Sequence, residues 1–352
     1  MDVRKKVEMD NNSLMTNEMI EQIKQIMGQA RTNVAKAVNN ELITAYWNIG
    51  RIIVEHEQEN NERAAYGKQT VKELSKVLTE EFGKGFSVSN LQFMRRFYQT
   101  YQIQQTLSVK LSWSHYCELL LISEDDKRSF YEKECINAGW SVRELKRQME
   151  TSLYERLLLS SGTENRERVL ELALNGNEIS KPSDIIKDPY VFEFLGIPED
   201  KPVLESDLEK TLTEHIEKFL LELGKGFMFV GTQQRITLGN EHYYVDMVFY
   251  NKILHSYVLI ELKTKKLMPA AVGQLNMYLN YYTEEVNEEN DNPPIGIILC
   301  TDRDFIGAEY ALGGLNNNIF ASKYTYVIPD KEELIAQVEK VLEKWNADNK
   351  QQ

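Results

Sequence analysis

Three charged side chains interrupt two apolar stretches in the second half of the chain. Asp246 lies inside the run 243–250, while Glu261 and Lys263 lie inside and directly after the run 257–262. A buried charge without a partner costs several kcal/mol, so strands that carry these residues must bring partners to them. Because side chains in a strand alternate between its faces, Glu261 and Lys263 project together, roughly 7 Å apart along the strand.

These residue types indicate metal-assisted phosphate chemistry. Two carboxylates brought close together repel each other, and one takes up a proton unless a cation lies between them. Mg²⁺, or Mn²⁺ in its place, prefers oxygen ligands and keeps several of its waters. We therefore expect Asp246, Glu261 and the main-chain carbonyl of Leu262 to bind the metal. Lys263 can orient or deprotonate a water, or stabilise charge that develops on a phosphate.

A helix expected at about 204–223 adds a further carboxylate. Its buried face follows from apolar residues read at about 100° per residue: Leu208, Leu212, Ile216, Phe219, Leu220 and Leu223. Glu209 lies within about 20° of Ile216 and Leu220, inside this apolar arc. A carboxylate there needs a partner, and we expect the metal site to provide it. Glu205, about 40° away from Glu209, is a second candidate.

A later helix, expected from Pro269 to about residue 285, carries two polar side chains on one face. Gln274 and Tyr278 lie four residues apart, which makes them neighbours on a helix. Gln274 can hold a nucleic-acid backbone or a metal-bound water, which makes it a candidate catalytic residue. Tyr278 can stack on a base or contact a phosphate, and it can equally pack in the core.

The elements that must position these residues form an α+β domain. Strands are expected at 227–238, 242–250, 256–263, 294–301 and about 323–328. Besides the helices at 204–223 and from Pro269, a short helix is expected near 305–312 and another at the C-terminus. The order αβββαβ combines hairpin-joined strands with a crossover. It therefore predicts a mixed sheet flanked by helices.

The first half of the chain predicts an all-helical domain over 14–158. Within GKGFSVSNLQFMRRFYQTY, a short turn leads into a helix that Ser87 or Ser89 can cap. Arg95 and Arg96 lie on this helix, apart from its apolar side. The outline is that of a helix-turn-helix, with or without a wing, whose arginines contact DNA. A helical bundle with a solvated arginine pair fits equally well. Residues 159–202 are expected to connect this domain to a second one over 203–346.

Together these residues resemble a known superfamily. Asp246, the tripeptide Glu261-Leu262-Lys263, the upstream helical Glu and the pair Gln274 and Tyr278 are similar to the PD-(D/E)xK nucleases and their RecB-like branch. Val245 stands where the superfamily name implies proline. LLELGKGFMFVGTQQ, YYVDMVFYN, GQLNMYLNYY and EYALGGLN resemble the YhcG-like family, and GFSVSNLQFMRRFYQTY resembles its N-terminal helical domain.

The resemblance implies a restriction-endonuclease-like core and hydrolysis of phosphodiester bonds. We therefore predict a metal-dependent DNA endonuclease, with RNA not excluded as a substrate. The alternative is a protein that binds nucleic acid or assembles with partners on a nuclease fold without cleaving. One metal site cuts one strand at a time, so a homo-oligomer, most simply a dimer, is expected.

Composition restricts where such a protein works and where it meets nucleic acid. No apolar run is long enough to span a membrane, and Cys117, Cys135 and Cys300 are too widely spaced for a disulfide framework or zinc knuckle, which favours the cytoplasm. The net charge is −13, yet the first 158 residues hold 22 basic and 22 acidic side chains. Because the acidic excess lies in the second half, we expect DNA contact mainly from the first.

Overall fold

The computed structural model describes residues 3–59, 64–101, 108, 110–160, 165–198, 202–302 and 318–348. Contacts divide the chain into two compact units, 1–123 (unit 1) and 124–352 (unit 2). The expected domain ranges 14–158, 159–202 and 203–346 place the division later and stay a prediction. Within the described ranges, no helix is both long and apolar enough to cross a membrane.

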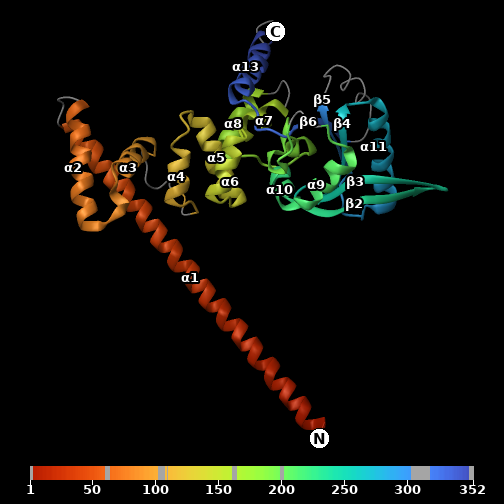
Figure 1. Ribbon diagram of the computed structural model, residues 1–352, viewed down its shortest axis with the longest axis horizontal. Coiled ribbons are helices and arrows are strands. Elements are labelled where there is room, and N and C mark those ends of the chain that lie inside the picture. Colours follow the sequence, from red (N-terminus) through yellow and green to blue (C-terminus); the bar gives the residue numbers. More distant parts are fainter. Residues whose placement is uncertain are drawn as a thin grey trace. The chain divides into compact units, whose positions relative to one another are not determined.

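The described part of unit 1 is helical, as predicted. Its longest element is α1 (Val3–Glu59). The others are α2 (Ala64–Phe82), the short 3₁₀ helix η1 (Lys84–Phe86), α3 (Val88–Thr100) and α4 (Trp113–Leu119) (Figure 1). α3 packs directly on α1 at Gly50, where a Cβ atom would collide with the main-chain carbonyl of Met94. The glycine therefore sets how closely these two helices approach.

The start of α3 agrees with the sequence. Ser87 caps the helix, because its Oγ accepts a hydrogen bond from the Asn90 backbone N–H at 3.2 Å. The apolar side of the helix is buried through Leu91, Met94 and Phe97. The capped helix after a short turn is thus present, while a helix-turn-helix role in DNA binding stays a prediction.

The two arginines of α3 differ in their surroundings. Arg95 Nε donates a hydrogen bond to Glu57 Oε2 on α1 at 2.7 Å. Arg96 is exposed. A phosphate contact by both residues stays a prediction, and for Arg95 it requires release from Glu57.

Unit 2 is built on a six-stranded mixed sheet in the order β1-β6-β5-β4-β3-β2, as expected for its fold class. Its strands are β1 (Tyr190–Val191), β2 (Phe227–Leu238), β3 (Glu241–Asn251), β4 (Ser256–Lys266), β5 (Ile295–Asp302) and β6 (Asn318–Thr325). The pairs β2–β3 and β3–β4 are antiparallel; β4–β5, β5–β6 and β1–β6 are parallel. β1 comes from the segment 188–197, in the expected connection, and docks on the sheet edge.

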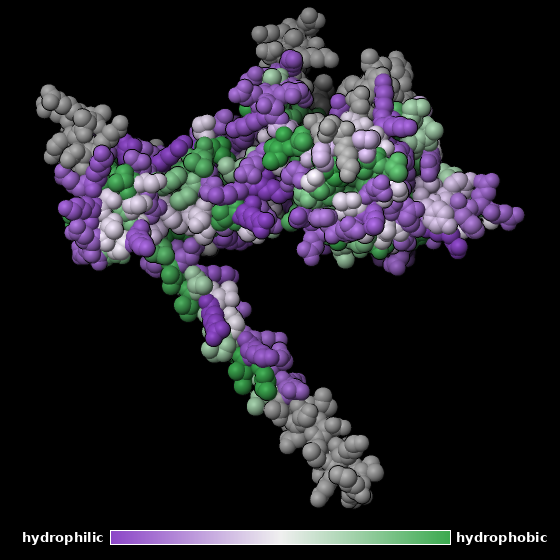
Figure 2. All heavy atoms as spheres, viewed as in Figure 1, coloured by the Kyte–Doolittle hydropathy of each residue, from purple (hydrophilic) through white to green (hydrophobic). Residues whose placement is uncertain are grey.

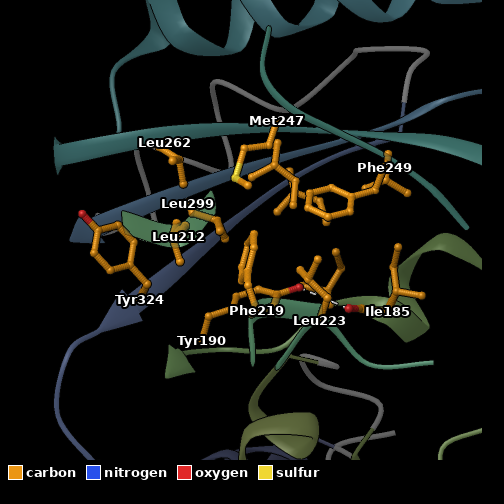
Figure 3. Packing of buried hydrophobic residues seen from close by; sticks show 14 of the residues in the cluster. Ile185, Tyr190, Leu212, Phe219, Leu223, Met247, Phe249, Leu262, Leu299 and Tyr324 are labelled. Atoms are coloured by element: carbon orange, nitrogen blue, oxygen red, sulfur yellow. Dashed lines mark hydrogen bonds between the residues drawn. The ribbon is translucent and has the colours of Figure 1, made fainter. Parts of the chain in front are cut away.

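Helices cover both faces of this sheet. The helices on the sheet are α9 (Glu205–Glu214), α10 (Ile216–Leu223) and α11 (Pro269–Tyr281), which continues into a π-turn η5 (Tyr282–Val286). The C-terminal helix α13 (Lys331–Asp348) packs instead against α7 (Leu153–Ser160) and α8 (Asn165–Asn175). One apolar layer joins α9 and α10 to the sheet, with Leu212 and Phe219 facing Met247 and Leu262 (Figure 3). A second layer joins α11 to the opposite face. The alternation of the strand residues supplies both layers.

The helix expected over 204–223 is in fact two helices. α9 ends at Glu214 and α10 begins at Ile216, with His215 (φ −113°, ψ 30°) between them. Helical phase is therefore not continuous from Glu209 to Ile216, which weakens the 100° reckoning that favoured Glu209 over Glu205. The short helix expected near 305–312 lies outside the described residues.

Among the described residues of unit 2, four further helices precede the sheet: α5 (Asp125–Ala138), α6 (Val142–Glu150), α7 (Leu153–Ser160) and α8 (Asn165–Asn175). Two short 3₁₀ turns, η3 (Pro182–Ile185) and η4 (Glu193–Leu195), follow them on either side of β1. Buried ion pairs tie these helices to the core. Glu222 on α10 is fully buried and lies 2.5 Å from Arg156 on α7 and 3.1 Å from Arg147 on α6.

Candidate active site

The structure brings the three strand residues of the predicted site together. Asp246 on β3 accepts a hydrogen bond at Oδ2 from the Leu262 backbone N–H at 2.8 Å. The Asp246 backbone N–H donates a long hydrogen bond to Glu261 Oε1 on β4, with the nitrogen 3.5 Å from that oxygen. Glu261 is 1% exposed, and Asp246 is half-buried. Antiparallel pairing of β3 with β4 thus places two carboxylates side by side at one place in the sheet.

Lys263 is the cation that faces these carboxylates. Its Nζ lies 3.4 Å from Glu261 Oε2 and 3.4 Å from Glu205 Oε2 on α9. Glu205 also accepts a hydrogen bond from the Thr264 backbone N–H at 3.2 Å. Lys263 therefore links the start of α9 to β4, and the structure brings Glu205 into direct contact with it.

The second helical carboxylate, Glu209, joins the cluster through a residue that the sequence did not single out. Gln233 on β2 donates from Nε2 to Glu209 Oε2 at 2.6 Å and reaches Asp246 Oδ1 at 3.5 Å. Both candidate helical carboxylates thus lie at the site, one beside Lys263 and the other beside Gln233. A catalytic role for Glu209, with Glu205 as the second candidate, stays a prediction.

Burial and like charge shift the protonation of this cluster. Burial, and then the neighbouring charge of Asp246, raises the pKa of Glu261 to about 7. Burial also raises the pKa of Asp246, although the Leu262 N–H and Lys263 partly oppose it. For Lys263, burial works to lower the pKa, but Glu261, Asp246 and Glu205 outweigh it and raise the pKa. Lys263 is consequently charged at neutral pH, and the two strand carboxylates compete for protons.

Gln274 and Tyr278 lie side by side on α11 as expected, but the tyrosine is in the core. Gln274 is exposed and donates a hydrogen bond from Nε2 to the Tyr278 hydroxyl. The Tyr278 hydroxyl donates in turn to the Tyr244 carbonyl at 3.3 Å, and its ring is fully buried against the α11 face of the sheet. A ring packed in this way has no free face for a base, so the structure favours the core-packing interpretation of Tyr278 over the stacking one. A catalytic role for Gln274 stays a prediction.

The donor set at the site suits a hard divalent cation. Asp246 and Glu261 present carboxylate oxygens whose mutual repulsion a cation relieves. The described residues contain no group of three or more His, Cys, Asp or Glu side chains placed to hold a metal by themselves. Two carboxylates and the Leu262 carbonyl match an ion such as Mg²⁺, which keeps several waters and is rarely enclosed by protein alone.

The arrangement can direct a water to a phosphate and stabilise the charge that develops on it. A divalent ion held by Asp246 and Glu261 would supply Lewis-acid polarisation of a phosphate oxygen. Lys263 holds a permanent positive charge next to that position, where it can orient a water or stabilise charge on the phosphate. Glu205 keeps the ammonium at this place by accepting from it.

Sequence patterns do not indicate one residue of this cluster, Gln233, and they rank another, Glu205, second. Gln233 belongs to a strand whose residues alternate without a chemical motif, and its role follows from an irregular backbone with φ +48°. Glu205 ranks second in the sequence because the 100° spacing treats the helix as continuous through His215. The sequence signal for Glu205 is its acidic side chain just upstream of the apolar residues, which is typical of the first turn of a helix.

Solved structures resemble part of this fold. A repair endonuclease from Pyrococcus abyssi is 18% identical, with a TM-score of 0.24, over 38% of this chain and 50% of that chain. The EndoMS–dsDNA2 complex is also 18% identical, with a TM-score of 0.26 over the same shares. The chain thus matches half the length of each, and these TM-scores are too low to carry a conclusion about it.

Sequence families give a closer relationship. The family described as the YhcG PDDEXK nuclease domain matches residues 183–339, and the DUF1016 N-terminal domain matches residues 22–156. YhcG of Escherichia coli (strain K12), a protein named as a nuclease, is 38% identical over 341 residues, which span 88% of this chain and 90% of that protein. PDDEXK nucleases generally use divalent metals, in agreement with the donor set described above. The chain therefore belongs to the YhcG family of PDDEXK nucleases.

Proposed function

We propose that this nuclease is an endonuclease that cleaves DNA with Mg²⁺ or Mn²⁺ bound at Asp246, Glu261 and the Leu262 carbonyl. The observation that carries the proposal is the contact of the buried Glu261 with Lys263, beside a second, half-buried carboxylate, Asp246. A structural ion pair needs one carboxylate for one ammonium. The second carboxylate is surplus to such a pair and gives the site its demand for a cation.

Each residue has a proposed task in phosphodiester hydrolysis. Asp246 and Glu261 hold the divalent ion against a phosphate oxygen of the substrate. Lys263 orients the attacking water and stabilises charge on the phosphate. Glu205 holds the Lys263 ammonium in place, and Gln274 on the exposed part of α11 contacts the substrate backbone. The non-cleaving alternative requires a site that has lost one of these groups, whereas all of them are present.

Cleavage assays with matched variants test this proposal. Single- and double-stranded DNA and RNA are incubated with the full chain and Mg²⁺, Mn²⁺ or excess EDTA. Asp246→Asn and Lys263→Ala should each lower the cleavage rate about 100-fold or more, because a removed electrostatic contact to the reacting group costs that much. Lys252→Ala, an exposed lysine in the turn between β3 and β4, should cleave like the wild type.

Three results would contradict the assignment. Undiminished cleavage in EDTA would exclude the metal. Wild-type rates in both Asp246→Asn and Lys263→Ala would place the active site elsewhere. Cleavage of RNA with no cleavage of DNA would make the chain a ribonuclease with the same chemistry.

We also propose that two copies of the chain associate through α1, so that two sites reach both strands of a duplex. Five apolar side chains on α1 are 41% to 63% exposed: Ile20, Ile23, Met27, Val34 and Val38. We refer to them as the α1 stripe, and Figure 2 shows hydrophobic side chains along this part of the helix. Their spacing of three, four, seven and four residues keeps them on one side of the helix. A second copy is the simplest occupant, as symmetric dimers are the commonest oligomers.

A further inference from the structure

Gln233 occupies an unusual place in the sheet. It lies in the middle of β2, between Thr232 and Gln234, which pair with Met247 and Val245 of β3. Gln233 therefore sits across the ladder from Asp246. Its φ is +48°, in the left-handed region that a residue with a side chain adopts at a cost, and such residues concentrate where function requires them.

The side-chain amide of Gln233 bridges two acidic residues from different elements. Nε2 donates to Glu209 Oε2 on α9 at 2.6 Å and lies 3.5 Å from Asp246 Oδ1 on β3. The other oxygen of Asp246, Oδ2, accepts from the Leu262 N–H at 2.8 Å. The Asp246 carboxylate is thus approached by a donor at each oxygen, and its orientation is defined from both sides.

The bridge parallels the one that Lys263 forms. Lys263 links the α9 carboxylate Glu205 to the strand carboxylate Glu261, whereas Gln233 links Glu209 to Asp246. The two bridges differ in charge. Lys263 cancels a negative charge, while the neutral amide of Gln233 orients two carboxylates and leaves their charge available to a cation. A lysine at residue 233 would compete with the metal, and an apolar residue would leave Asp246 free to rotate.

We propose that Gln233 is a positioning residue, which holds Asp246 in the orientation that binds the divalent ion and ties it to Glu209 on α9. The inference rests on the proposed metal-dependent cleavage at Asp246 and Glu261. Gln233 meets the proposed site through its amide contacts with Asp246 and Glu209, so its effect passes through Asp246. Removing a group that orients a metal ligand typically lowers metal affinity or activity 10- to 100-fold.

The matched variants separate the amide from the backbone. Gln233→Gly removes the amide but adopts a positive φ without strain, so the fold of β2 is kept. Gln233→Asn tolerates the same φ and keeps a shortened amide. Asp246→Asn serves as the reference for loss of the ligand itself. Mn²⁺ alone is titrated into each full-length protein by calorimetry, and kcat and KM on double-stranded DNA are measured separately at saturating Mn²⁺.

The expected result is a specific pattern. Gln233→Gly binds Mn²⁺ about 10-fold more weakly, with a lower kcat, an unchanged KM for DNA and an unfolding midpoint in EDTA no lower than wild type. Gln233→Asn should have a Mn²⁺ affinity and a kcat between those of Gln233→Gly and wild type. Wild-type Mn²⁺ affinity and kcat in Gln233→Gly, with both lost in Asp246→Asn, would overturn the inference and leave the proposed function standing. Retention of Mn²⁺ binding and cleavage by Asp246→Asn would overturn the proposed function, and this inference with it.

Discussion

At the scale of single residues, the site places like charges together in the metal-free protein. Glu261 is 1% exposed and lies next to Asp246, and its pKa is raised from the ordinary 4.5 to about 7. A carboxyl whose pKa is higher in the folded state than in the unfolded chain favours folding when protonated. Its contribution is therefore full below about pH 4.5 and is lost as the pH rises through about 7. At neutral pH and above, the free site opposes folding.

Replacing Glu261 by glutamine should consequently stabilise the metal-free protein at alkaline pH. Glu261→Gln stays neutral at every pH, so no buried negative charge forms at residue 261 as the pH rises. Between about pH 5 and about pH 8, its free energy of unfolding should therefore rise relative to wild type by on the order of 2 kcal/mol. Urea unfolding in EDTA at both pH values measures this. Equal pH dependence in the two proteins would show that Glu261 titrates in its ordinary range.

Magnesium should stabilise wild type more than it stabilises Glu261→Gln. An ion that binds only the folded state stabilises it by an amount that rises with the logarithm of its concentration over the dissociation constant. Wild type should therefore gain stability from Mg²⁺ at about pH 8, while Glu261→Gln, with one ligand weakened, should gain much less. The same urea experiment with Mg²⁺ in place of EDTA makes the comparison, and an equal gain would exclude Glu261 from the metal site.

At the scale of elements, the sequence predicted most of what positions the site, and its failures have physical causes. Strand alternation and the apolar runs were enough to place Asp246, Glu261 and Lys263 in neighbouring strands. The break at His215 was missed because apolar residues continue across it with helical spacing. Gln233 was missed because a positive φ at a residue other than glycine has no signature in a strand pattern. The helix break and the unusual φ are both set by tertiary packing, and local periodicity carries no information about that packing.

Sequence patterns also gave no sign of the ion-pair network around Glu222 on α10. This network links the helices α6 and α7 to the nuclease core. Glu222 is fully buried; its Oε1 lies 2.5 Å from Arg156 and accepts from the Val191 N–H at 3.0 Å. Burial alone raises the pKa of Glu222, but Arg156, Lys187 and Arg147 outweigh it and lower the pKa to about 2. This network explains why the helices that follow Ser123 belong to the same compact unit as the sheet.

Glu222→Gln should destabilise unit 2 by about 3–5 kcal/mol at neutral pH, because buried guanidinium groups lose their counter-charge. A group with a lowered pKa contributes stability above its unfolded value of 4.5 and loses that contribution as the pH falls through about 2. The difference from wild type should thus shrink in acid. Glu217→Gln, an exposed glutamate on the same helix, should change stability by less than about 0.5 kcal/mol. Equal stability of both variants would mean that the network contributes nothing net.

At the scale of the whole molecule, the α1 stripe has a distribution of side-chain sizes that suits a second copy of itself. Large residues lie toward its N-terminal end and smaller ones toward its C-terminal end. Two antiparallel copies centred between Gly28 and Gln29 would set large against small at three levels: Ile20 on Ala37, Ile23 on Val34, and Met27 on Ala30. Packing of this kind fills space without voids, which is what a helix pair in water requires.

Charge placed in the α1 stripe should therefore separate the dimer. Met27→Glu with Val34→Glu puts two carboxylates on the apolar side, seven residues apart, where each would be buried against the partner helix. Gln25→Glu with Thr32→Glu adds the same charge at the same spacing on the opposite side of α1 and serves as the control. Light scattering on the full-length wild type and control should give about twice the 41.0 kDa of one chain, and the stripe variant should give one chain mass. Cleavage of single-stranded DNA should persist in the stripe variant, because each site is complete within one chain, while double-strand breaks should become rare relative to nicks. A wild type that scatters as one chain, or a stripe variant that stays dimeric, would remove α1 as the contact between copies.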